Sequence, residues 1–171
     1  MVVHSREDVE GTKQIVDQVR SAGGRAIPAI AAVEDRASAW ALVERIVAEW
    51  AQLDVVIADV AGLVPEMDQS DASSTVPPAL RSLLDEVTCP LNRQEWGRVV
   101  LLFQGPAARG HTTARANSWI RSLESHYAPP RLLNAVVAAP GATGDGVART
   151  LLFLGSGWNT AVSGAVLPLH A

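Results

Sequence analysis

The sequence predicts an α/β protein in which parallel strands alternate with helices. Two observations favour this fold class. Short runs rich in β-branched residues alternate with longer stretches whose apolar residues recur at helical spacing. Two of these runs, residues 53–58 and 97–103, are mostly apolar, as is typical of strands buried on both faces of a parallel sheet. The 171 residues are expected to form one domain, residues 1–171.

The composition, 48% hydrophobic and 19% charged residues, is that of a soluble globular protein. A net charge of -4 with scattered basic residues argues against nucleic-acid and membrane-surface binding. No apolar run approaches the ~20 residues of a membrane span, and a polar segment follows Val3, so a cytoplasmic protein is expected. Cys89 is the only cysteine, which excludes a disulfide framework, and we expect it to be buried at a helix end. No metal site is predicted.

The first part of the chain predicts a strand, a helix, a strand and a second helix. Residues 1–8 are typical of a strand that runs into a helix, so we expect the N-terminus to lie inside a sheet. The helix that follows ends at Gly23-Gly24, and its apolar stripe is Val9, Thr12, Ile15, Val16 and Val19. In residues 25–31, Pro28 favours an edge strand. Asp35 then caps a helix to Gln52, with the stripe Trp40, Val43, Val47 and Trp50.

The remaining elements follow in the same alternation. Residues 53–58 are predicted to be a central strand, and residues 63–74 a loop. Pro77-Pro78 starts a helix whose buried face is Leu80, Leu83, Leu84 and Val87. The later predictions are a strand at 97–103, a turn at 104–110, a helix from 112 or 113 to 125, a strand at 132–138, a helix at 146–154 and a strand at 165–169.

Several of these stretches match motifs of one family in the right order. Residues 53–57 with Ala61-Gly62 match a strand that ends in Asn-Asn-Ala-Gly, and residues 134–143 match one that ends in Asn-Ala-Val-Ala-Pro-Gly. Further matches lie at residues 2–35, 97–100, 121–123 and 162–168. The chain therefore resembles the short-chain dehydrogenase/reductase family, and most closely its 3-oxoacyl-(acyl carrier protein) reductase branch.

The resemblance starts at the family's second strand. The family's first βα unit carries the Gly-rich turn that holds the dinucleotide pyrophosphate at a helix N-terminus, so the domain is expected to lack that site. Asp59-Val60 stands where the family has Asn-Asn, and Ala32 where it has an Asp. No cofactor is therefore expected, except NADPH if a partner chain completes the site. We interpret the Gly-rich residues 141–146 as a loop that enters a helix.

The family's reaction needs a Tyr as general acid, a Lys four residues later and a Ser. This chain has one tyrosine, Tyr127, and one lysine, Lys13, far apart in the sequence. Alignment on residues 121–123 puts Arg109 and Thr113 at the Tyr and Lys positions. Hydride transfer by this chain alone is therefore not predicted.

Two sets of polar residues are candidates for another chemistry. His111, Asp59, Arg109 and Arg115 could form an acid/base cluster, although solvated or capping roles at loops are the simpler interpretation. A small-molecule cleft at the ends of the first and third strands would use Ser5, Arg6, Asp59, Gly62 and Gln104.

Without the family's central first strand, the second and fourth strands would keep unpaired backbone groups, each costing about 1–3 kcal/mol when buried. Either the two halves close up or another chain donates a strand. We predict closure, which gives a doubly wound, Rossmann-derived parallel sheet with the flavodoxin-like order 2-1-3-4-5-6 and helices on both faces.

The family assembles through surfaces that this chain retains. The candidate partner-interface residues are Trp96, Trp119, Leu123, Leu152, Trp158 and Val166, with a core position as the open alternative for each Trp. The leading hypothesis is a non-catalytic subunit that stabilises or tunes an active 3-oxoacyl reductase-like partner, in fatty-acid or polyketide biosynthesis. Self-association is the other expected assembly. The alternatives are an enzyme with altered acid/base chemistry, or one whose NADPH-binding half comes from another chain.

Overall fold

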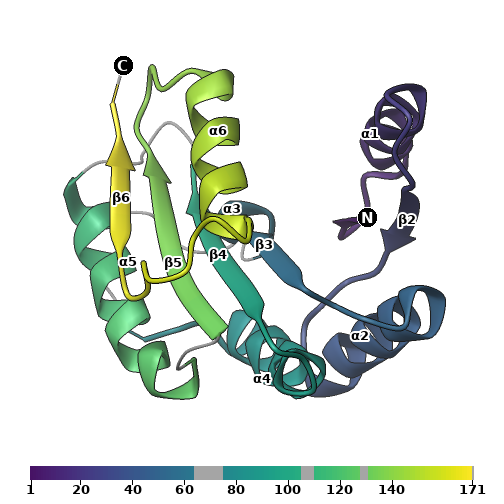
Figure 1. The fold of residues 1–171 in the computed structure, drawn as a ribbon, viewed down its shortest axis with the longest axis horizontal. Helices are drawn as coiled ribbons and strands as arrows, with labels where there is room; N and C mark the ends of the chain where they lie inside the picture. Colours follow the sequence, from purple (N-terminus) through teal and green to yellow (C-terminus); the bar gives the residue numbers. More distant parts are fainter. Residues whose placement is uncertain (64–74, 105–109, 128–130, 171) are drawn as a thin grey trace.

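The computed structural model describes residues 1–63, 75–104, 110–127 and 131–170. These residues form an α/β fold with parallel strands, as predicted (Figure 1). The strands are β1 (Val2–Ser5), β2 (Ile27–Ile30), β3 (Val55–Asp59), β4 (Gly97–Phe103), β5 (Arg131–Ala138) and β6 (Val166–Leu169). The helices are α1 (Val9–Ser21), α2 (Arg36–Trp50), α3 (Val60–Leu63), α4 (Pro78–Asn92), α5 (Gly110–Leu123) with the 3-10 turn η1 (Glu124–His126), and α6 (Gly144–Gly155).

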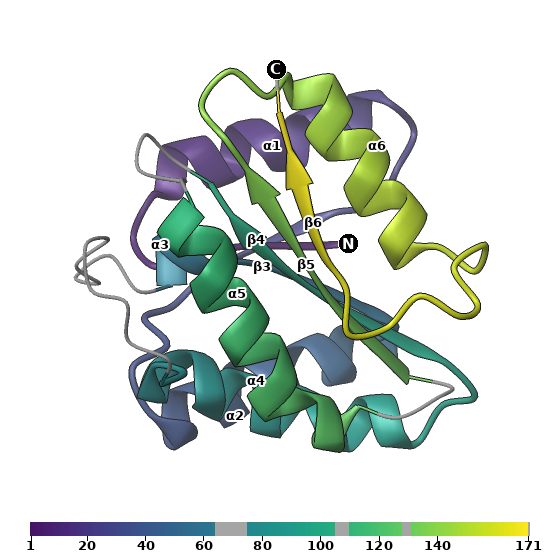
Figure 2. The ribbon, with the colours of Figure 1, turned by 90° about the vertical axis from the view of Figure 1, so that its left-hand side faces the viewer.

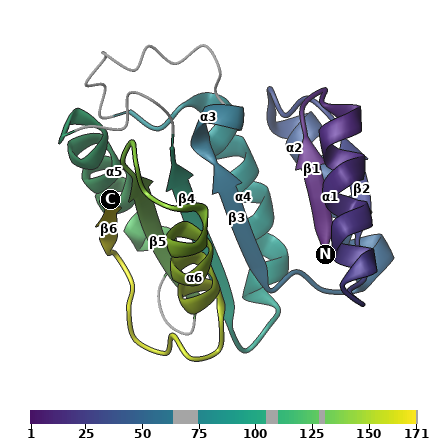
Figure 3. The ribbon, with the colours of Figure 1, turned by 90° about the horizontal axis from the view of Figure 1, so that it is seen from above.

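The strands form two separate sheets, β1-β2 and β3-β4-β5-β6, and every pair in them is parallel. The predicted continuous order 2-1-3-4-5-6 is therefore wrong, because β1 does not pair with β3. Figure 3 shows β1 and β3 on the two sides of this break. The halves have not closed up, and β3, expected to be central, is an edge strand of its sheet.

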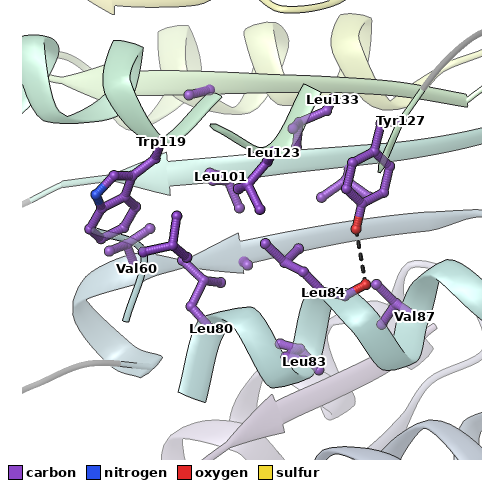
Figure 4. Packing of buried hydrophobic residues seen from close by; sticks show 14 of the residues in the cluster. Val60, Leu80, Leu83, Leu84, Val87, Leu101, Trp119, Leu123, Tyr127 and Leu133 are labelled. Atoms are coloured by element: carbon purple, nitrogen blue, oxygen red, sulfur yellow. Dashed lines mark hydrogen bonds between the residues drawn. The ribbon is translucent and has the colours of Figure 1, made fainter. Parts of the chain in front are cut away.

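Helices cover both faces of the four-stranded sheet. The packed side chains of α2, α4 and α5 cover one face of the four-stranded sheet, and α6 covers the other over β4 and β5. Figures 2 and 3 place α1 on the same side as α6. The larger core cluster contains Leu80 and Leu84 of α4, Leu101 of β4 and Trp119 of α5 (Figure 4). Ala29 and Val33 extend this cluster to the β2 side, so the two sheets share a core.

Local sequence signals explain where the helices begin. Asp35 caps α2 as predicted, since its side chain accepts a hydrogen bond from the backbone N–H of Ser38 at 2.9 Å. Asp8 caps α1 in the same way through Gly11, also at 2.9 Å. The predicted buried face of α4 is confirmed, and this helix extends past Pro90 to Asn92.

Several burial predictions are wrong. Val9 and Ile15 of the predicted α1 stripe are exposed, and Met1 at the expected buried N-terminus is exposed too. In α2 the buried side chains are Ala39, Leu42 and Val43, whereas Trp40 is exposed. Cys89 lies exposed within α4 and not buried at a helix end.

The predicted loop at 63–74 and turn at 104–110 lie mostly outside the described residues. Gly110 starts α5, two residues or more before the predicted start of this helix. Among the residues that the structure describes, no helix is long and apolar enough to span a membrane.

Candidate functional site

Asp59 and Gln104 meet where β3 and β4 end. Nε2 of Gln104 donates to Oδ2 of Asp59 at 2.7 Å, and the backbone N–H of Ala61 donates to Oδ1 at 3.1 Å. Ligands of open α/β sheets bind at such carboxyl ends of parallel strands. Beside this pair lies a groove of about 490 Å³, lined by Gln104 and mostly by small or apolar residues such as Pro140 and Leu151. The candidate site therefore offers one amide and one carboxylate, and these two groups are already hydrogen-bonded to each other.

The predicted cleft between the first and third strands is not assembled. Ser5 Oγ accepts from Thr12 Oγ1 at 2.8 Å and donates to the carbonyl of Asp8 at 3.0 Å, so its hydroxyl serves the start of α1. Arg6 forms an exposed ion pair with Glu34 at 2.6 Å. Gly62 lies in α3, after β3. The Ser5 and Arg6 candidates thus belong to one sheet, and Asp59, Gly62 and Gln104 to the other.

The only tyrosine of the chain is a core residue. Tyr127 donates to the carbonyl of Leu84 at 3.0 Å, as the dashed line in Figure 4 indicates, and Thr88 Oγ1 donates to its hydroxyl at 3.0 Å. Burial raises the pKa of Tyr127 to about 12, despite the opposing hydrogen bond from Thr88. Lys13, the only lysine, lies exposed on α1. Tyr127 therefore has a structural role and no lysine partner.

The predicted acid/base cluster receives little support. Arg109 lies outside the described residues, and His111 is in α5 with its side chain outside the description. Arg115 is buried within α5, which corrects the expectation of a solvated or capping residue. Asp59 is hydrogen-bonded to Gln104, which lines the strand-end groove. Among the described residues, no three His, Cys, Asp or Glu side chains are grouped so as to hold a metal ion.

The N-termini of α1 and α6 do not fit a dinucleotide pyrophosphate. The first turn of α1 carries the carboxylate of Asp8 against the backbone N–H of Gly11, and Glu10 follows. At α6, Thr143 Oγ1 accepts from the backbone N–H of Gly146, and Asp145 lies in the first turn. Negative side chains at these positions repel an anion that the helix dipole would otherwise attract. These two helix starts therefore offer no pyrophosphate site.

Of the predicted interface residues, Trp119 and Leu123 are each 1% exposed and belong to the core, which removes them from any surface. Trp96, Leu152 and Trp158 lie at the surface, and Val166 is half-buried in β6. Trp158 is 87% exposed and Leu152 is 71% exposed. Their use in an interface stays a prediction.

A buried polar network fixes the turn that carries Trp158, and sequence reasoning missed it. Asn159 Oδ1 accepts from the backbone N–H of Val162 at 2.9 Å, and Asn134 Nδ2 donates to the carbonyl of Val162 at 2.8 Å. Arg98 donates to the carbonyl of Asn159 at 2.5 Å, and burial lowers the pKa of this guanidinium. The one available signal was Asn134 inside an otherwise apolar strand, because a buried amide requires partners.

Comparison with known proteins identifies the fold. No protein-family model matches the chain, and no curated protein matches it in sequence. Among solved structures, a hydroxysteroid dehydrogenase from Escherichia coli is similar with a TM-score of 0.72 and 15% identity. The match covers 98% of this chain and 82% of that one. The chain thus shares a Rossmann-like α/β fold with this dehydrogenase.

Proposed function

We propose that this chain is a non-catalytic, reductase-like subunit that binds and stabilises an active 3-oxoacyl reductase-like partner. The observation that carries the proposal is the position of Trp158. This side chain is 87% exposed and lies on a turn that the buried Asn159 holds through a hydrogen bond with Val162. A large aromatic side chain on a fixed turn is typical of interface anchors, because little conformational entropy is lost on binding. The exposed Leu152 and Phe153 of α6 precede it in the chain and add apolar surface.

The core position of Tyr127 supports a role other than hydride transfer. Its hydroxyl is engaged by Leu84 and Thr88, so it has no access to a substrate carbonyl at the ends of β4 and β5. The hydrogen-bonded pair of Asp59 and Gln104 supplies no replacement for the Tyr and Lys of the related reductases. We therefore expect the chain to act by binding and stabilising an active partner.

The test is co-expression with the 3-oxoacyl reductases of the same organism, followed by measurement of complex mass and affinity. Trp158→Ala is expected to weaken binding at least about tenfold, as loss of an interface tryptophan does. Trp40→Ala is the matched control, since Trp40 is 55% exposed on α2, and it should leave the affinity unchanged. Equal effects of the two variants on affinity would contradict the proposal. So would a partner whose complex mass and thermal stability are the same with and without this chain.

The groove beside Gln104 favours a second candidate function, an enzyme whose NADPH-binding half is supplied by another chain. Calorimetric titration with NADPH, with and without the partner, distinguishes the two candidate functions. Binding of NADPH only to the complex, lost in Gln104→Ala, would favour the second candidate.

A further inference from the structure

We draw no further inference here: the strongest candidate, the exposed apolar surface patch that Trp40 forms with Ala37, Ala41 and Ala48 on the outer face of α2, carries nothing because nothing in the structure shows what covers it.

Discussion

Strands β4 and β1 both contain a Val-Val pair but have very different surroundings. All seven residues of β4 are buried, whereas none of the four residues of β1 is. β4 has a strand on each side and helices on both faces, and β1 has one neighbour. The number of neighbours, and not β-propensity, therefore decides how much each strand contributes to stability.

The same contrast extends to the two sheets. The four-stranded sheet supplies most of the core through β4 and β5, and α4, α5 and α6 pack against it. The two-stranded sheet contributes Ala29 to that core, with Val2 packed at its margin. Substitutions should therefore cost most in the first region and least at the break.

The largest effect is expected for Leu101→Ala in β4. Leu101 is fully buried among α4 and α5 side chains, so its truncation should lower the free energy of unfolding by about 3 kcal/mol. Val3→Ala in half-buried β1 should lower it by less than about 1 kcal/mol. Urea denaturation of both variants measures the difference. Equal losses would mean that β1 is as well packed as β4.

A second prediction concerns pH. Because burial raises the pKa of Tyr127 to about 12, from 10.0 in its unfolded reference, the folded state holds the phenolic proton more tightly. This contribution is fully present below about pH 10 and is lost as the pH rises toward about 12, and the total loss is about 2–3 kcal/mol. Urea denaturation at about pH 9 and about pH 12 should show this loss, and Tyr127→Phe should remove it. An ultraviolet titration midpoint of the single tyrosine near 10 in the folded chain would contradict the prediction.

Most of the helices and strands could be predicted from sequence, because each depends on local periodicity and capping. Asp35 and the apolar face of α4 are examples. The sheet order could not be predicted, since whether β1 reaches β3 depends on packing between distant segments. The error carried over to Ser5 and Arg6, which were assigned to a cleft that required this pairing. Trp119 is buried and Trp158 is exposed, because tertiary packing decides which aromatic residue enters the core.

A smaller effect is expected at the cap of α1. Asp8→Ala removes the acceptor of the Gly11 N–H bond, and caps of this type contribute about 1 kcal/mol. Because α1 packs mainly on β1 and β2, we expect amide exchange to accelerate about fivefold in α1 and to stay unchanged in β4. Asp8→Asn keeps an acceptor and serves as the control. Acceleration in β4 as well would mean that the two regions unfold as one unit.

The smallest effect is expected at the break itself. Ile57 and Val100 are register partners on one face of the sheet, at 49% and 0% exposed. Val100→Ala should lower the free energy of unfolding by about 2 kcal/mol, whereas Ile57→Ala should change it by less than about 0.5 kcal/mol. Urea denaturation of the free protein compares the two, and a loss at Ile57 equal to that at Val100 would mean that Ile57 is covered in solution.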